Sequence, residues 1–159
     1  MSKPGLITLA LVAMAAPAVA ASPGYVDDRS SPESVVASFY NAISQQEYAR
    51  AWSYYQDGEG VPKFDAFVTG YQNTASVTLT MGEPSGDGAA GSTYWHLPVS
   101  IDAVDTAGKH SYFAGCYTLR LANPQIQAEP PFQPLHITEG HLKKAKGAGK
   151  SYLPKSCDQ

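Results

Sequence analysis

The sequence predicts an α+β fold, with two or three N-terminal helices packed on a curved antiparallel sheet of about four strands. Between residues 32 and 71, apolar residues recur at spacings of three and four, which is the period of an amphipathic helix. From residue 75 onward they alternate with polar residues, which is the period of a strand with one buried face. Because each apolar face must be buried, the helices are expected to cover one face of the sheet.

The first expected helix begins at Ser31, Pro32 and Glu33. A serine can cap free backbone amides, a proline is favoured at the first helical position, and a glutamate faces the positive end of the helix dipole. Two shorter helices are expected over residues 46–55 and 63–71. The apolar faces of the three helices consist of Val35, Val36, Phe39, Tyr40 and Ile43; of Tyr48, Ala51, Trp52 and Tyr55; and of Phe64, Phe67, Val68 and Tyr71.

Four strands, separated by turns rich in Gly and Pro, are expected after the helices. Apolar side chains of each strand should face the helices, and the polar ones, such as His96, Ser100 and Asp102, should face away. The strands are expected near residues 75–81, 92–104, 110–121 and 135–144, and the turns at residues 82–91, 106–108 and 124–134.

Two stretches of sequence resemble a known family. The segment VVASFYNAI at residues 35–43, followed by Tyr48, Ala51 and Trp52, resembles the first two helices of the NTF2-like superfamily of cone-shaped α+β domains. The strand segment AGCYTLR at residues 114–120 and the later PFQPL resemble poorly characterised exported bacterial members. The resemblance implies a cone with an internal pocket, and a sheet face through which such domains often form homodimers. It implies no single reaction, because the superfamily includes isomerases, dehydratases, transport factors and binding modules.

The first 20 residues have the pattern of a cleaved export signal. Lys3 precedes an apolar run at residues 6–16, and small side chains follow at residues 18–20. The run is shorter than the roughly 20 residues that cross a bilayer, so no stable membrane anchor is expected. We therefore expect a periplasmic or secreted protein. Its parts are a signal peptide at residues 1–20, a flexible leader at 21–31, one domain at 32–145 and a basic C-terminal tail at 146–159.

Cys116 and Cys157 are the two cysteines of the chain. An even number of cysteines in a small exported domain favours a disulfide. The absence of a CxxC spacing argues against metal-binding or redox cysteines. The predicted disulfide would close a loop of about 40 residues and hold the C-terminal tail on the domain.

Charge is unevenly distributed along the chain. Residues 22–140 contain five Lys or Arg and thirteen Asp or Glu, whereas residues 141–159 contain five Lys and one Asp. The basic tail is interpreted as a solvated edge whose lysines prevent pairing between sheets. Contact of the tail with anionic lipid, polysaccharide or nucleic acid is the alternative, and we expect no nucleic-acid partner.

No complete catalytic arrangement can be recognised in the sequence. Superfamily enzymes that resemble ketosteroid isomerase place a carboxylate base and a Tyr or acid donor inside the cone. Glu139 is an even number of positions from Leu135 and Ile137, so in a regular strand it would face the same side as they do, and it is the best candidate base. Gly140 could introduce a bulge that shifts the register. A strand-end carboxylate in contact with solvent is the simpler interpretation, so an enzyme is the less favoured hypothesis.

Neither a metal site nor a cofactor site is expected. His136 and His141 are separated by an odd number of positions, so an unbulged strand would point them to opposite faces. The stretch GDGAAG at residues 86–91 matches GxGxxG, but a strand-like segment follows it where a dinucleotide loop would open a helix. A hairpin connection is the better interpretation.

Aromatic residues are the remaining candidates for a binding site. Tyr and Trp combine an apolar ring with a hydrogen-bonding group, and most of those here are expected to fill the core. Trp52, Tyr55 and Tyr71 are expected near the mouth of the cone and are the candidate ligand-binding residues. The leading hypothesis is a non-enzymatic exported module that binds a small apolar ligand or an envelope protein. A structural protein with a filled cone is a further alternative.

Overall fold

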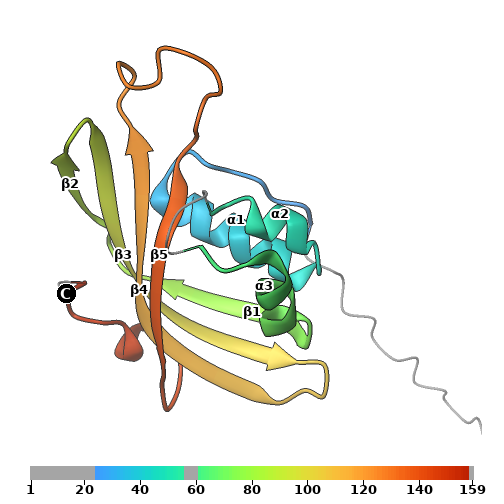
Figure 1. Cartoon of the computed structure of the whole chain (residues 1–159). Coiled ribbons are helices and arrows are strands. Elements are labelled where there is room, and N and C mark those ends of the chain that lie inside the picture. The colour runs from blue at the N-terminus through green and yellow to red at the C-terminus, as the bar shows by residue number, and fades with distance from the viewer. Residues whose placement is uncertain (1–23, 56–60, 158–159) are drawn as a thin grey trace, which may run out of the picture.

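The computed structural model describes residues 24–55 and 61–157 and confirms the α+β fold: three helices pack against an open, curved antiparallel sheet (Figure 1). The helices precede all the strands in the chain, as the change of period in the sequence predicted. The elements are α1 (Pro32–Ser44), α2 (Tyr48–Trp52), α3 (Phe64–Tyr71), β1 (Thr74–Met81), β2 (Ser85–Ala89), β3 (Ser92–Asp105), β4 (His110–Ala122), β5 (His136–Lys144) and the 3₁₀ turn η1 (Lys150–Tyr152).

The sheet has the strand order β1-β3-β4-β5, and β2 pairs with the first part of β3 on the same edge as β1. Met81 of β1 lies opposite Val99, and Ser85 of β2 lies opposite His96, so the two short strands follow each other along β3. All pairings in this sheet are antiparallel. Figure 1 shows the three helices on one face of the sheet and the C-terminal segment on the other side.

Strand β2 lies in the segment that was expected to be a turn. Its sequence, Ser-Gly-Asp-Gly-Ala, carries no alternating apolar residues and is exposed throughout, so periodicity gives no signal for it. Ala90 and Gly91 form the connection to β3 with φ values of 47° and 75°. Positive φ at both central residues is typical of the tight turn of a two-residue hairpin. The GxGxxG stretch therefore lies in a β-hairpin.

Most of the core between helices and sheet consists of residues that the two periods predicted, but the fully buried Tyr54 was not among them, and the expected core residue Phe64 is 42% exposed. Ser31 caps α1, since its side-chain oxygen accepts a hydrogen bond from the amide of Ser34 at 3.1 Å. Each large apolar side chain buried in such a core contributes roughly 1.5–3 kcal/mol to folding. Fully buried apolar side chains are Val35, Val36, Phe39 and Ile43 of α1, Leu97 and Val99 of β3, Leu119 of β4 and Ile137 of β5.

Helix α2 is shorter than the expected span of residues 46–55. Gln46 adopts a positive φ of 59°, which no helix interior tolerates, so the helix begins after it. After Trp52 the chain turns toward the sheet, where the carbonyl of Tyr54 accepts a hydrogen bond from the amide of Ile137 at 2.8 Å. Tyr55 forms an isolated bridge with the same residue. Pairing with β5 therefore replaces the expected last turn of the helix.

The predicted disulfide between Cys116 and Cys157 is confirmed, with 5.8 Å between the two Cα atoms. Cys116 is flanked along β4 by inward-facing residues, so its side chain lies on the outer face, away from the helices. The bond holds the tail against this face. The amide of Gly149 adds a hydrogen bond to the Ser100 hydroxyl at 3.0 Å.

Residues 24–31, part of the expected leader, hydrogen-bond to the helical layer. The Tyr54 hydroxyl donates to Asp27 at 2.6 Å, and the amide of Asp28 donates to the hydroxyl of Ser38 at 2.9 Å. The guanidinium of Arg29 lies 4.2 Å from the centre of the Tyr54 ring. The expected signal peptide at residues 1–20 lies outside the described residues.

Within residues 24–55 and 61–157, no helix combines the length and the apolar character needed to cross a bilayer.

Candidate functional site

A pocket of about 480 Å³ lies on the inner, helix-facing side of the sheet, beside the C-terminal end of α3. Its volume falls within the range of roughly 300–1,000 Å³ typical of small-molecule sites. Most of the lining is apolar, as such sites require. The lining residues are Tyr40, Gly70, Tyr71, Asn73, Thr74, Val77, Ile101, Ala103, Val104, Asp105, Ser111, Phe113 and Leu142.

The pocket exists because the helical layer covers the sheet unevenly. Leu97 and Val99 of β3 are fully buried, whereas Ala103, further along the same strand and on the same face, is only partly buried. Phe113 of β4 and Leu142 of β5 are likewise partly buried. The second half of β3 therefore extends past the tightly packed core, and its inward side chains form the floor of the pocket.

Tyrosine side chains surround Phe39 at the inner end of the pocket. The hydroxyl oxygens of Tyr40 and Tyr117 lie 2.6 Å apart and share a hydrogen bond. The ring centres of Tyr55 and Tyr71 lie 5.7 Å and 6.0 Å from that of Phe39. Edge-to-face arrangements of this kind are favourable for aromatic rings. The cluster therefore joins α1, the chain after α2, α3 and β4 around one ring.

These tyrosines are neutral hydrogen-bonding groups. Burial raises the pKa of Tyr40 and of Tyr117 well above the usual value, because a phenolate would lose its hydration there. Burial also raises the pKa of Tyr55 and Tyr71. The cluster can therefore donate hydrogen bonds to a ligand, and it holds no negative charge at neutral pH.

Among the residues that line the pocket, Asp105 carries the single carboxylate. It stands at the end of β3, where its Oδ1 accepts hydrogen bonds from the amides of Ala107 and Lys109, both at 2.9 Å. These bonds close the hairpin between β3 and β4. The carboxylate thus has a structural role in the turn.

Glu139 does not face the helices, contrary to the parity expected for it. A register shift at Thr138 sets Glu139 opposite Thr118, whereas Ile137 lies opposite Leu119. The bulge turns the Glu139 side chain to the outer face, where it is 54% exposed and its Oε2 lies 3.1 Å from Nε2 of His141. The structure therefore does not bring Glu139 into the pocket with the tyrosines.

The outer face carries a second, more open hollow of about 770 Å³ beside the disulfide. Its polar side chains are hydrogen-bonded within the sheet: Nδ1 of His96 lies 3.3 Å from the Thr118 hydroxyl, and Nε of Arg120 donates to the Ser92 hydroxyl at 3.0 Å. Two carboxylates and one guanidinium line this hollow, so charges of both signs are mixed in it. Its lining residues are Ser85, Asp87, Tyr94, His96, Thr118, Arg120, Thr138, Glu139 and Cys157.

The three candidate ligand-binding residues occupy different positions. Tyr71 lines the inner pocket, and Tyr55 belongs to the tyrosine cluster behind it. Trp52 does not line the pocket. Its indole nitrogen donates to the carbonyl of Pro62 at 3.0 Å, and its ring packs on Phe64 with 5.9 Å between the ring centres.

Sequence reasoning assigned the floor of the pocket to the core. Ile101, Ala103 and Phe113 have the same parity as the buried residues before them, so their alternation carries no sign of a cavity. The available signal was length. An expected strand of 13 residues, at 92–104, spans roughly 43 Å, which is more than twice the roughly 20 Å of a 13-residue helix. A layer of short helices cannot cover it completely.

No three His, Cys, Asp or Glu side chains within the described ranges come together as metal ligands. His136 is buried, with its Nδ1 2.8 Å from the carbonyl oxygen of Pro134, and His141 pairs with Glu139.

Comparison of the chain with protein-family models, with curated proteins and with solved structures gives no match. Membership of the NTF2-like superfamily stays a prediction from the sequence.

Proposed function

We propose that the protein is an exported, non-enzymatic binding module of the NTF2-like type that holds a small apolar ligand in the inner pocket. The observation that carries this proposal is the pocket itself: about 480 Å³, bounded by Val77, Ile101, Ala103 and Phe113, with neutral tyrosine hydroxyls at its inner end. Burial of a ligand against these side chains supplies roughly 25 cal/mol per Å² of apolar surface.

The residues that line the pocket support a binding function rather than an isomerase-like reaction. Proton abstraction next to a carbonyl needs a carboxylate within hydrogen-bonding reach of the substrate. Glu139 lies on the outer face, and Asp105 is engaged by the hairpin amides. The tyrosine hydroxyls can hold a ligand oxygen by hydrogen bonds, which is an orienting role. A pocket of this size also favours a ligand binder over a filled cone.

Export is supported by two features. The disulfide between Cys116 and Cys157 fits an oxidising compartment. The signal-like residues 1–20 predict passage to the periplasm or the exterior. A ligand delivered there, or a partner in the envelope, fits this location.

Native mass spectrometry of the protein purified from its own host tests this function. The wild-type protein is expected to carry an additional small-molecule mass. An Ala103→Trp variant should lack that mass, because the indole fills the pocket floor. An Ala89→Trp variant on the exposed β2 makes the same change elsewhere and should retain it. Equal occupancy of the two variants, or wild-type protein that carries no small molecule and binds no apolar probe, contradicts the proposal.

A further inference from the structure

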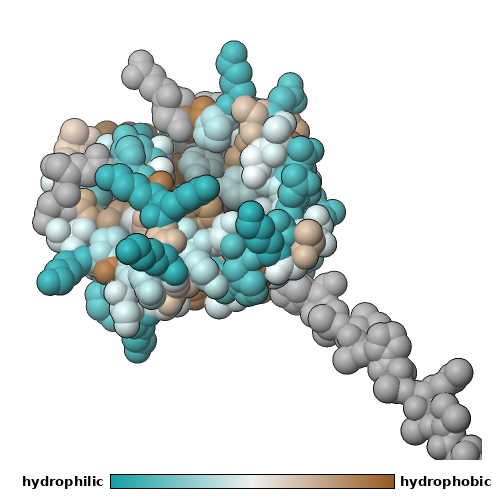
Figure 2. All heavy atoms as spheres, turned by 90° about the horizontal axis from the view of Figure 1, so that it is seen from below, coloured by the Kyte–Doolittle hydropathy of each residue, from teal (hydrophilic) through white to brown (hydrophobic). Residues whose placement is uncertain are grey.

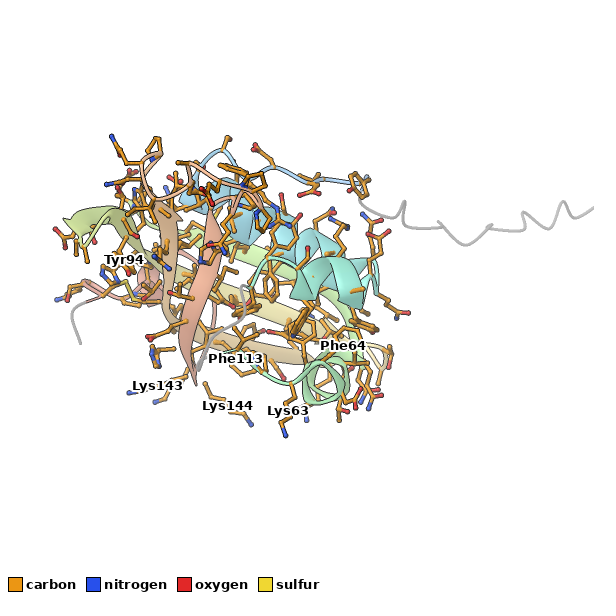
Figure 3. The ribbon with its side chains drawn as sticks, turned by 45° about the horizontal axis from the view of Figure 1, so that its top comes forward. Lys63, Phe64, Tyr94, Phe113, Lys143 and Lys144 are labelled. Atoms are coloured by element: carbon orange, nitrogen blue, oxygen red, sulfur yellow. A yellow bond between two sulfur atoms is a disulfide. The ribbon has the colours of Figure 1, made fainter. Side chains whose placement is uncertain are left out.

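Two lysines project on the side of the molecule where Phe113, a residue that lines the inner pocket, lies (Figure 3). Lys144 ends β5 opposite Phe113, and it shares the inner-face parity of Leu142, which lines the pocket. Lys63 is the N-cap residue of α3, at the other end of this helix from the pocket-lining Gly70 and Tyr71. Figure 3 shows Lys63 and Lys144 projecting on the same side as Phe113, one from the helical layer and one from the sheet. Figure 2, a view of the molecule from below, shows long hydrophilic side chains standing among hydrophobic ones.

Both lysines are available to a ligand. Their side chains are exposed, and within the described ranges neither forms an ion pair with a carboxylate. Asp65, in the first turn of α3, is the acidic residue nearest to Lys63 in sequence, and the two do not form an ion pair. Among the residues that the structure describes, the two exposed ammonium groups thus have no carboxylate partner.

The opposite end of the pocket has the opposite charge. Asp105 lies four residues beyond Ile101 along β3, and Ile101 lies opposite Phe113, which in turn lies opposite Lys144. Four residues of strand span roughly 13 Å. The pocket is thus apolar in its middle, negative at the hairpin end and flanked by positive charge near the end of β5. An anionic group would be repelled at the first end and attracted at the second.

We propose that the ligand is a single-chain fatty acid, whose hydrocarbon chain lies in the pocket and whose carboxylate lies between Lys63 and Lys144. This inference rests on the proposed binding function and assigns the chemical class of the ligand. The apolar floor accepts the chain, and none of the lining residues is a cation, so the carboxylate remains at the mouth, where water and lysine both solvate it.

The contribution of the lysines is modest, because the contacts are exposed to solvent. Exposed ion pairs contribute a factor of roughly 1.5 to 5 each, and salt screens them. Reversal of both charges replaces attraction by repulsion, so a loss of about tenfold in affinity is expected at low salt. The neutral alcohol of the same chain length should not respond.

Isothermal titration calorimetry with decanoate and decanol, each below its aggregation concentration, tests the inference. For the wild-type protein at low salt, decanoate is expected to bind about fivefold more tightly than decanol. A Lys63→Glu/Lys144→Glu variant should lose about tenfold in affinity for decanoate and none for decanol. The matched control, Lys150→Glu/Lys155→Glu, makes the same net charge change in the C-terminal segment and should leave both affinities unchanged.

The possible failures are distinct. If decanol binds but decanoate binds no more tightly, or if the control variant loses as much affinity as the mouth variant, the fatty-acid inference is overturned and the apolar pocket stands. If neither compound binds the wild-type protein, the inference and the proposed function fail together.

Discussion

The hydroxyl oxygens of Tyr40 and Tyr117 lie 2.6 Å apart, although 77 positions separate the two residues in the chain. The hydrogen bond that they share joins α1 to β4 at the inner end of the pocket. Both side chains are almost completely buried, at 5% and 1% exposure. A buried hydrogen bond contributes little to the net free energy of folding. Removal of one partner is costly, because the remaining polar group is then buried with neither a hydrogen-bond partner nor water.

This pair predicts strong non-additivity. Tyr117→Phe leaves the Tyr40 hydroxyl without its closest partner and should lower the free energy of unfolding by about 1–3 kcal/mol. Tyr40→Phe should have a similar effect. The double variant should cost clearly less than the sum of the two, because it leaves neither hydroxyl unpaired. Urea denaturation of the four proteins measures the cycle, and strictly additive values would contradict a direct bond.

The disulfide predicts a large loss of stability on removal. A Cys116→Ser/Cys157→Ser variant should lose about 4 kcal/mol, as the loop-entropy model gives for a loop of this length. Denaturant unfolding with and without a reducing agent checks this value. The wild-type protein should fall to the level of the variant when reduced, while the variant should not respond. A wild-type protein insensitive to reductant would contradict the bond.

Gly115 predicts a steric requirement at the pairing of β4 and β5. A Cβ atom at this position would lie 1.9 Å from the backbone oxygen of His141, which cannot move without opening the strand pair. Gly115→Ala should therefore destabilise the fold by about 3 kcal/mol or more. Gly88→Ala on β2 is the matched control, since a Cβ there meets nothing within 4 Å. Thermal unfolding should separate the two variants, and equal melting temperatures would refute the close approach.

His136 predicts a loss of stability in mild acid. Burial lowers the pKa of His136 below its usual value of 6.5, so the unfolded chain binds the proton more readily than the folded one. The stability associated with neutral His136 is complete above about pH 6.5 and is lost as the pH falls through that value and the lower folded-state pKa. His136→Gln keeps a donor for Pro134 and should flatten this part of the pH profile. Denaturation at pH 8 and pH 5 compares the two, and parallel profiles would contradict the argument.

The sequence predicted the elements whose side chains alternate clearly between apolar and polar. The helix period of α1 and the strand period of β3 and β4 follow from burial against each other, so local pattern and tertiary structure agree there. Strand β2 was missed because Ser85, Asp87 and the glycines between and after them carry no apolar face. Its formation depends on backbone pairing with β3.

Prediction of the site was less complete, for two physical reasons. The bulge at Thr138 reverses the direction of every side chain that follows it, so the parity assigned to Glu139 was wrong. The pocket also depends on where the helical layer ends, and that depends on packing rather than on the alternation along β3. Tyr71 and Trp52 were both candidates because they are aromatic residues expected near the mouth of the cone. Tyr71 does line the pocket, whereas the Trp52 ring packs on Phe64.

Methyl-detected NMR of the protein with bound decanol tests most directly whether the inner pocket is the ligand site. Ile101 lines the pocket and is 2% exposed, whereas Ile126 lies in the loop between β4 and β5 and is 63% exposed. Binding in the inner pocket should give intermolecular nuclear Overhauser effects between decanol and the Ile101 methyl groups, and none to Ile126. Effects to Ile126 without any to Ile101 would contradict it, because the alcohol would then bind exposed surface and leave the pocket empty.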